Sequence, residues 1–279
     1  MRNLDQDTIT EAVLARHANT ANPRLKKIMT SLVQHLHDFA REVELTEEEW
    51  FRGIEFLTRC GHITDDKRQE FILLSDVLGL SMLTVAQNND KPVGCTEATV
   101  FGPFHVEGAP HYDLGADISN GARGIPCLVR GTVRGIDGEV VANAHIDVWQ
   151  SDENGLYDVQ HTEIDHAQAR GIVHSNGEGK FWFKSILAVS YAIPHDGPVG
   201  MLLEATGRHP WRPAHLHFLI KAPGYETLIT HVFRSDDQYL DSDAVFGVRQ
   251  SLIAQWERQP DGTYLVEYDF VLNPAPAKG

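Results

Sequence analysis

The chain has few cysteines and no long apolar run. Its 279 residues include three cysteines, Cys60, Cys95 and Cys127, and none of them lies in a Cys-x-x-Cys pair. This number and spacing argue against a disulfide framework and a zinc ribbon, and they fit reduced thiols in a cytoplasm. No uninterrupted apolar stretch reaches the about 20 residues that span a bilayer, and residues 1–7 lack the apolar core of a secretory signal. We therefore expect a cytoplasmic protein that does not insert into a membrane.

Basic residues are scarce relative to acidic residues. The chain has 24 lysines and arginines against 39 aspartates and glutamates, which gives a formal net charge of −15. Such a chain repels a phosphate backbone on average, so neither nucleic acid nor an anionic membrane surface is expected as a partner. Histidine, by contrast, is frequent, with 15 residues. Because imidazole is a common metal ligand, the composition makes metal chemistry a hypothesis to test.

Residues 1–95 carry helical signals. Asn22-Pro23 is typical of a helix N-terminus, and apolar residues then recur at helical spacing. Those residues are Leu25, Ile28, Met29, Leu32, Val33 and Leu36. Thr46-Glu-Glu-Glu49 has the form of a capping box, and Thr64-Asp65 predicts the start of a further helix. We therefore expect a helical region over this part of the chain.

The chain changes character after residue 95, where glycine and proline separate short runs with the composition of strands. The expected strands cover residues 127–133, 145–150, 180–184, 215–220, 227–233 and 264–271. Asp137-Gly138 is typical of a hairpin turn. Many short strands with turns between them predict an antiparallel β-sandwich over residues 96–279. The expected fold class is mainly β, with the helical region as a first domain and the sandwich as a second.

His215-Leu216-His217 is the first candidate for chemistry. Side chains two apart on a strand point to the same face, so the two imidazoles would form half of a metal site. Arg212 precedes the pair by three residues, and its guanidinium could bind an anion or a developing negative charge. Taken alone, the pair is more often structural than ligating, and an arginine more often forms a surface ion pair.

Two other kinds of metal site use histidine pairs of this type. A cupin iron site needs a glutamate three or four residues after the second histidine, where this chain has Ile220 and Lys221. A zinc hydrolase needs a third histidine or a carboxylate at defined spacing. His231, His209 and Glu204 are loose candidates for that third ligand, so the alternative stays open at this point.

Two tyrosines lie in predicted turns and offer a different ligand chemistry. Tyr157 follows the 145–150 strand, and Tyr191 lies in a loop that contains proline. A phenol has a pKa near 10 and binds a metal well only when a strongly Lewis-acidic ion removes its proton, as Fe³⁺ can. A role in the core or in an interface is the commoner one for either tyrosine.

Four segments together closely resemble the intradiol ring-cleaving dioxygenases. They are Val100-Phe-Gly-Pro-Phe104, Asp147-Val-Trp-Gln-Ser-Asp-Glu-Asn-Gly-Leu-Tyr157, Tyr191-Ala-Ile-Pro-His-Asp-Gly-Pro198 and Gly207-Arg-His-Pro-Trp-Arg-Pro-Ala-His-Leu-His217. The segments follow the family's order at similar separations, and the resemblance spans nearly the whole chain. It implies a β-sandwich with an N-terminal helical linker that forms a homodimer. It also suggests phospholipid as a ligand of that linker.

The resemblance also implies a cofactor and residue roles. The family binds one non-haem Fe³⁺ per chain through two tyrosines and two histidines, which match Tyr157, Tyr191, His215 and His217. Tyr191 would also act in catalysis by accepting a proton from the substrate. Arg212 matches the family's motif arginine and would stabilise the negative charge that develops as O₂ attacks the ring. The substrate pocket carried over by motif consists of Leu73, Asp76, Val100, Gly102, Pro103, Phe104, Ile193, Pro194 and Val245.

Residues 225–233 and 239–247 most resemble the hydroxyquinol 1,2-dioxygenases within that family. His231 stands where catechol enzymes more often carry glutamine. Asp76 also fits the hydroxyquinol group, because its carboxylate could accept a hydrogen bond from the third hydroxyl of benzene-1,2,4-triol, although it could equally be an ordinary carboxylate on a helix surface. The expected product is 3-hydroxy-cis,cis-muconate, the enol form of maleylacetate, in the catabolism of aromatic compounds.

Two alternatives remain at this point. One is a catechol or chlorocatechol 1,2-dioxygenase that produces cis,cis-muconates. The other is a non-catalytic β-sandwich, because residues 131–149 also resemble transthyretin-like binding modules and a sandwich alone does not determine function.

Overall fold

The structure is a computed structural model that describes residues 2–65 and 68–276. The chain divides into two compact units, residues 1–59 and 60–279. This boundary falls inside the third helix, whereas the predicted division after residue 95 separates helical from strand-rich sequence. Each unit is described by itself below.

The first unit is helical. It contains α1 (Ile9–Arg16), the 3₁₀ helix η1 (His17–Asn19), α2 (Pro23–Glu42) and most of α3 (Glu47–Ile63). Asn22 caps α2 as predicted, since its Oδ1 accepts hydrogen bonds from the backbone N–H of the second and third residues that follow. Thr46 and Glu49 form the predicted capping box of α3, with bonds of 2.9 and 3.2 Å between side chain and backbone. These local signals are therefore confirmed.

Most of the large apolar residues of α2 and α3 face outward. Ten large apolar side chains in and beside these helices form an outward-facing stripe. They are between 43% and 56% exposed, which is far more than a core position allows. The stripe consists of Leu25, Ile28, Leu32, Leu36, Phe39, Val43, Trp50, Phe51, Ile54 and Leu57. A helix of a folded chain normally buries such a stripe against another element.

The second unit opens with α4 (Glu70–Val77) and α5 (Leu80–Asn88). The predicted helix start at Thr64-Asp65 is wrong. The hydroxyl of Thr64 donates to the carbonyl of Cys60 at 2.7 Å and so belongs to the end of α3, whereas α4 begins at Glu70. The Glu70 carboxylate is fully buried and accepts a hydrogen bond from the backbone N–H of Val199 at the start of α6 (Pro198–Ala205). This contact joins the first residue of α4 to the first turn of α6.

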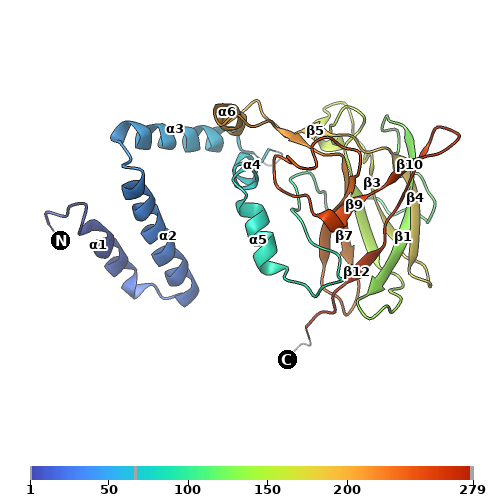
Figure 1. The fold of residues 1–279 in the computed structure, drawn as a ribbon, viewed down its shortest axis with the longest axis horizontal. Helices are drawn as coiled ribbons and strands as arrows, with labels where there is room; N and C mark the ends of the chain where they lie inside the picture. The colour runs from blue at the N-terminus through green and yellow to red at the C-terminus, as the bar shows by residue number, and fades with distance from the viewer. Residues whose placement is uncertain (1, 66–67, 277–279) are drawn as a thin grey trace. The chain divides into compact units, whose positions relative to one another are not determined.

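Two five-stranded sheets form the rest of the second unit. The first has the order β10-β11-β1-β12, with β4 also paired to β1, and the second has the order β3-β2-β7-β8-β9. The strands of the first sheet are β1 (Pro126–Gly135), β4 (Lys180–Ile186), β10 (Trp256–Arg258), β11 (Tyr264–Glu267) and β12 (Phe270–Leu272). Those of the second are β2 (His145–Trp149), β3 (Arg170–His174), β7 (His215–Lys221), β8 (Leu228–Arg234) and β9 (Ile253–Ala254). Figure 1 shows the two sheets as separate layers, with β1, β4 and β10 in one and β3, β7 and β9 in the other.

The predicted sandwich is confirmed, but its sheets are mixed. β11 and β12 run parallel to β1, and β9 runs parallel to β8. The predicted strand 264–271 is also divided in two. At the break, the Asp269 carboxylate accepts hydrogen bonds from both the backbone N–H and the hydroxyl of Thr132, so a side chain replaces the backbone ladder there.

The hydrophobic core lies between the two sheets, and β7 shows how it places the candidate site. All residues of β7 from 215 to 220 are buried. Leu216, Phe218 and Ile220 belong to the core cluster. Because successive side chains of a strand point to opposite faces, His215 and His217 point away from that core, where they form the site described below.

Among the described residues, no single helix is long and apolar enough to cross a membrane; α4 and α5 meet those limits only when joined, and they bend by 77° at the break between them.

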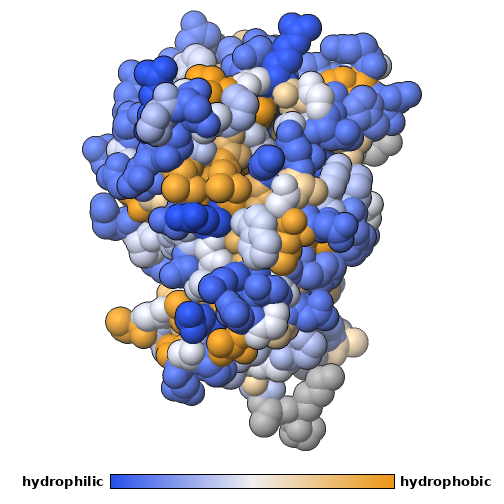
Figure 2. All heavy atoms as spheres, turned by 90° about the vertical axis from the view of Figure 1, so that its right-hand side faces the viewer, coloured by the Kyte–Doolittle hydropathy of each residue, from blue (hydrophilic) through white to orange (hydrophobic). Residues whose placement is uncertain are grey.

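The face shown in Figure 2 is mostly hydrophilic, with apolar patches set among charged and polar side chains.

Candidate active site

The two histidines of β7 lie side by side, as the strand period requires. The Nε2 atoms of His215 and His217 are 3.1 Å apart, and both side chains are buried. The Nδ1 atom of His215 lies 2.7 Å from the carbonyl of Pro213 and donates a hydrogen bond to it. With its proton on Nδ1, His215 presents the lone pair of Nε2 to the neighbouring ring.

Both predicted tyrosines reach the same point from other elements. Tyr157 lies in the turn that follows β2, and Tyr191 begins the two-residue strand β5 (Tyr191–Ala192). The Tyr157 hydroxyl lies 2.8 Å from Nε2 of His217 and 3.3 Å from the Tyr191 hydroxyl. Two phenolic oxygens and two imidazole nitrogens therefore converge on one small volume.

The protonation states of these groups fit a metal site. Burial, followed by the charge of Arg212, lowers the pKa of His215 to about 3. Burial and the neighbouring His215 lower the pKa of His217 well below its usual range, so both rings are neutral at pH 7, which is the form that binds metals. Burial and the Tyr191 phenol raise the pKa of Tyr157, so its proton leaves only when a cation takes its place. The donor set suits a hard, strongly Lewis-acidic ion.

A third histidine, His231, belongs to the same cluster. It lies on β8 directly opposite His217, and their ring centroids are 4.2 Å apart. One ligand atom from each of His215, His217 and His231 lies within 4.8 Å of the others, so this triad could hold a metal ion. The sequence offers His231 as a loose third ligand of a zinc site and as a position typical of the hydroxyquinol group. It does not place His231 beside His217, because the cross-strand register is not visible in a spacing.

Arg212 is buried beside the donor atoms. It lies in β6 (Trp211–Arg212), directly opposite Tyr191 in the β5–β6 pair. Its Nη1 lies 3.4 Å from the Tyr191 hydroxyl and 3.2 Å from Nε2 of His215. The alternative of a surface ion pair is wrong, because Arg212 pairs with the buried carboxylate of Asp243. The guanidinium is therefore a permanent positive charge next to the four donors.

The structure brings five of the nine predicted substrate residues to one cavity, which has a volume of about 510 Å³. They are Leu73, Pro103, Phe104, Ile193 and Pro194. The ring of Phe104 stacks on the ring of Tyr157 with a centroid distance of 4.4 Å. This contact connects the cavity wall to the donor cluster.

The other four predicted pocket residues do not line that cavity. Val100 and Val245 are buried. Gly102 lies against the donors, because a Cβ atom at this position would be 3.0 Å from Cε1 of His217. Asp76 is 5% exposed, which makes the helix-surface alternative wrong, and burial raises the pKa of its carboxyl group.

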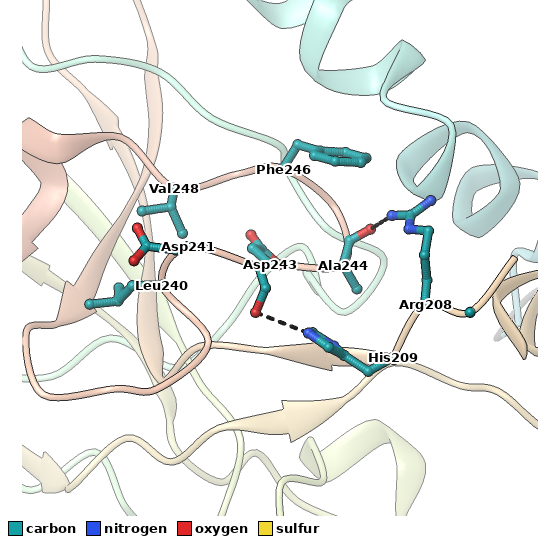
Figure 3. Close-up of a pocket in the computed structure, with 10 residues that line it drawn as sticks. Arg208, His209, Leu240, Asp241, Asp243, Ala244, Phe246 and Val248 are labelled. Atoms are coloured by element: carbon teal, nitrogen blue, oxygen red, sulfur yellow. Dashed lines mark hydrogen bonds between the residues drawn. The ribbon is translucent and has the colours of Figure 1, made fainter.

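A second cavity, here called the outer pocket, has a volume of about 480 Å³ and is lined in part by Asp243. It is lined by Gly207, Arg208, His209, Leu240, Asp241, Ser242, Asp243, Ala244, Phe246 and Val248. Arg208 donates to the carbonyl of Ala244 at 2.9 Å (Figure 3), and Nε2 of His209 lies 2.9 Å from the Ser242 hydroxyl. None of the predicted ligands lines this pocket.

Sequence reasoning missed two buried ion pairs around the site. One is Arg212 with Asp243. The other is Arg170 with Asp158, the residue after Tyr157, and Nη1 of Arg170 also donates to the carbonyl of Phe104 at 3.0 Å. Arg170 thus ties the Tyr157 turn to the predicted substrate loop. The two partners of Arg170, Asp158 and Phe104, lie 12 and 66 residues from it in the sequence, and no local pattern predicts these contacts.

Comparison with known proteins gives the family. A model described as "Dioxygenase" matches residues 100–274, and one described as "Catechol dioxygenase N terminus" matches residues 22–96. A 6-chlorohydroxyquinol 1,2-dioxygenase of Cupriavidus pinatubonensis is 67% identical over 98% of this chain and 99% of its own length. A hydroxyquinol 1,2-dioxygenase of Nocardioides simplex is 52% identical over 97% of this chain and 96% of its own.

The fold agrees with that family. A solved hydroxyquinol 1,2-dioxygenase structure from Pseudomonas putida DLL-E4 matches with a TM-score of 0.90 and 47% identity, over 97% of this chain and 99% of that one. These matches confirm the resemblance seen in the motifs and replace the alternative of a non-catalytic sandwich. The chain belongs to the intradiol ring-cleavage dioxygenases, oxidoreductases that open an aromatic diol with O₂.

Proposed function

We propose that the chain cleaves hydroxyquinol, benzene-1,2,4-triol, between its two adjacent hydroxyl-bearing carbons and produces 3-hydroxy-cis,cis-muconate. The observation that carries this proposal is the convergence of two phenols, two neutral imidazoles and a buried guanidinium beside a cavity. Relatives named hydroxyquinol 1,2-dioxygenase are 46% to 52% identical to the chain, whereas a relative named catechol 1,2-dioxygenase, from Candida albicans, is 38% identical.

The proposed cofactor is one Fe³⁺ per chain, held by Tyr157, Tyr191, His215 and His217. Support comes from the mixed oxygen and nitrogen donors and from the neutral state of both imidazoles. When bound, a ferric ion would draw electron density from the diol and make its ring open to attack by dioxygen. In this proposal His231 is a neighbour of the ligands and not a ligand itself, and its Nδ1 lies 3.5 Å from Nη2 of Arg212.

The side chains of the site have separate tasks in this proposal. Tyr191 accepts a proton from one substrate hydroxyl at its phenolic oxygen, which lies 3.4 Å from Nη1 of Arg212. The guanidinium stabilises the phenolate and then the negative charge that develops on the substrate. Phe104 and Ile193 supply flat apolar walls that hold the ring and exclude water.

We propose that Asp76 recognises the third hydroxyl of the substrate by accepting a hydrogen bond from it. Its side chain is buried on α4, where burial raises the pKa of the carboxyl group and the charge of Arg212 offsets part of that shift. A site built to bond a hydroxyl discriminates strongly against an analogue that lacks it, because the buried polar group is then left without a partner.

Asp76→Leu is therefore expected to lower kcat/KM for hydroxyquinol by about 10-fold or more, the loss of a hydrogen bond to a charged group, with a smaller loss for catechol. Steady-state oxygen uptake on both substrates measures the ratio. Leu73→Met, which changes a neighbouring wall residue and no polar group, is the matched control. Equal losses on the two substrates for Asp76→Leu would contradict this role.

Ring substitution gives a second candidate substrate. Because the 67% identical relative is named for 6-chlorohydroxyquinol, that compound is included beside hydroxyquinol, catechol and chlorocatechols in one oxygen-uptake series on the iron-loaded protein. Turnover of the hydroxyquinols well above that of the catechols supports the proposal. The opposite order would instead favour a catechol or chlorocatechol 1,2-dioxygenase.

We further propose a cytoplasmic homodimer in which residues 1–95 form the linker and dimerisation region and residues 96–279 the catalytic domain. The outward stripe of α2 and α3 supports this, because a second copy of the chain would cover it. A phospholipid bound between the helices is the accompanying proposal for that interface.

Leu32→Glu places a charge in the middle of the stripe and is expected to shift the protein from dimer to monomer, since burying an unpaired carboxylate is unfavourable. Light scattering after size-exclusion chromatography measures the mass, and lipid extraction followed by mass spectrometry tests for phospholipid. Lys27→Glu on an exposed position of the same helix is the control. A wild-type protein that is monomeric at every concentration would refute the dimer.

A further inference from the structure

Arg212 is held by a carboxylate to which the proposed chemistry has so far given no task. Nε of Arg212 donates to Oδ1 of Asp243 at 3.0 Å, and Nη2 donates to Oδ2 at 3.3 Å. The side chains are 3% and 2% exposed, so the pair is almost entirely shielded from water. A bidentate pair fixes the plane of the guanidinium as well as its position.

That plane directs the remaining N–H groups toward the donor cluster. Nη1 faces the Tyr191 hydroxyl and Nε2 of His215, while Nη2 faces His231. We infer that Asp243 is a positioning residue for ring cleavage: it orients Arg212 so that Nη1 meets the negative charge that develops on the substrate. The inference rests on the proposed function, because only there does Arg212 act on a substrate.

The same carboxylate also holds a loop. Oδ2 accepts a hydrogen bond from the backbone N–H of Gly247 at 2.9 Å, and Oδ1 accepts one from that of Val245 at 3.3 Å. The carbonyl of Gly247 in turn accepts a bond from the Thr99 hydroxyl at 2.8 Å, next to the start of the 100–104 loop. Asp243 therefore connects the arginine to two segments that carry predicted walls of the substrate pocket.

Gly247 packs directly against the pair. A Cβ atom at this position would lie 3.0 Å from Nη2 of Arg212 and 3.2 Å from Oδ2 of Asp243. Such spacings are tighter than ordinary contact, and the Thr99 hydroxyl would lie at 3.1 Å, so an alanine would push against the pair and Thr99 while every polar group remains. Gly247→Ala thus perturbs the geometry of the pair without removing its charge.

The chain offers a matched control on the same loop. Asp241 and Asp243 both line the outer pocket, and Figure 3 shows both side chains there. Asp241 is exposed and, within the part of the chain that the structure describes, no hydrogen bond or ion pair to its carboxylate is found. Asp241→Asn therefore removes one negative charge from the same loop without touching Arg212.

The test compares Asp243→Asn, Gly247→Ala and Asp241→Asn as iron-loaded proteins that turn over hydroxyquinol. In Asp243→Asn the amide NH₂ faces an N–H of Arg212 in either orientation, because Arg212 donates to both carboxylate oxygens, so the guanidinium moves. We expect kcat to fall about 10- to 100-fold, since misplacing a catalytic group by about 1 Å costs up to about 100-fold. KM is expected to change less than kcat, and iron content and the visible band are expected to stay as in the wild type. The kcat of Gly247→Ala is expected to lie between those of Asp243→Asn and the wild type. The kcat of Asp241→Asn is expected to match the wild type.

A double-mutant cycle separates positioning from mere stability. If Asp243 acts through Arg212, then Asp243→Asn and Gly247→Ala lower kcat in the wild type but cause no further fall in an Arg212→Ala background. An equal fall in both backgrounds, or a kcat for Asp243→Asn equal to that of Asp241→Asn, would overturn the inference. If Asp243→Asn does not fold, the Gly247→Ala arm of the cycle decides alone. Failure of the proposed function is distinguishable, since the wild-type protein would then neither bind iron nor consume oxygen with hydroxyquinol.

Discussion

Tyr157→Phe is expected to abolish the visible absorption that a tyrosinate bound to Fe³⁺ produces in the wild type, or to reduce it to the part contributed by Tyr191. The substitution removes a single oxygen from a fully buried ring that stacks on Phe104, so its packing is retained. It takes away the donor that lies 2.8 Å from Nε2 of His217. Iron affinity should fall as well, because one of four protein ligands is lost, and activity should fall with it.

Absorption spectroscopy and iron analysis of the purified variant measure these effects. Tyr225→Phe is the matched control, because its hydroxyl bonds to Glu139 at 2.6 Å and belongs to a different part of the second unit. An unchanged spectrum and full iron content in Tyr157→Phe would remove this residue from the ligand set.

Arg212→Ala should lower kcat about 100- to 1,000-fold, which is the usual cost of removing one preorganised donor from a developing negative charge. The iron and its visible band should remain, because the guanidinium is not a ligand. The substitution also leaves the buried Asp243 carboxylate without its partner, and breaking a buried pair typically costs about 3 to 5 kcal/mol of stability.

Two measurements keep the catalytic and structural effects of this substitution apart. Thermal unfolding reports the loss of stability, and kcat is compared at a temperature where the variant is fully folded. Arg130→Ala, which removes a half-exposed arginine paired with Glu267 on the first sheet, should change neither quantity strongly. Full activity in folded Arg212→Ala would contradict the role assigned to the guanidinium.

The parts of the fold and site that could be predicted from sequence follow from short-range rules. Side chains of a strand alternate with a period of two residues, so His215 and His217 had to share a face. A capping box is complete within four residues, so Thr46 and Glu49 predict the start of α3. By contrast, α4 begins at Glu70, whose carboxylate accepts a bond from the backbone N–H of Val199, 129 residues away, and no helix begins at Thr64-Asp65.

The positioning groups were invisible for the same reason. Asp243 reaches Arg212 over 31 residues and His231 reaches His217 through the β7–β8 register. Both contacts are created by chain reversal, not by any spacing that a single sequence displays. The family resemblance supplied the four candidate ligands, whereas the groups that orient them required coordinates.

The central claim is that Tyr157, Tyr191, His215 and His217 bind one ferric ion. Anomalous diffraction at the iron absorption edge, on crystals of the iron-loaded protein without substrate, tests it most directly. We predict a single iron peak per chain, within bonding distance of both phenolic oxygens and both Nε2 atoms. A peak bound by the triad of His215, His217 and His231 with both tyrosines out of reach would contradict the account.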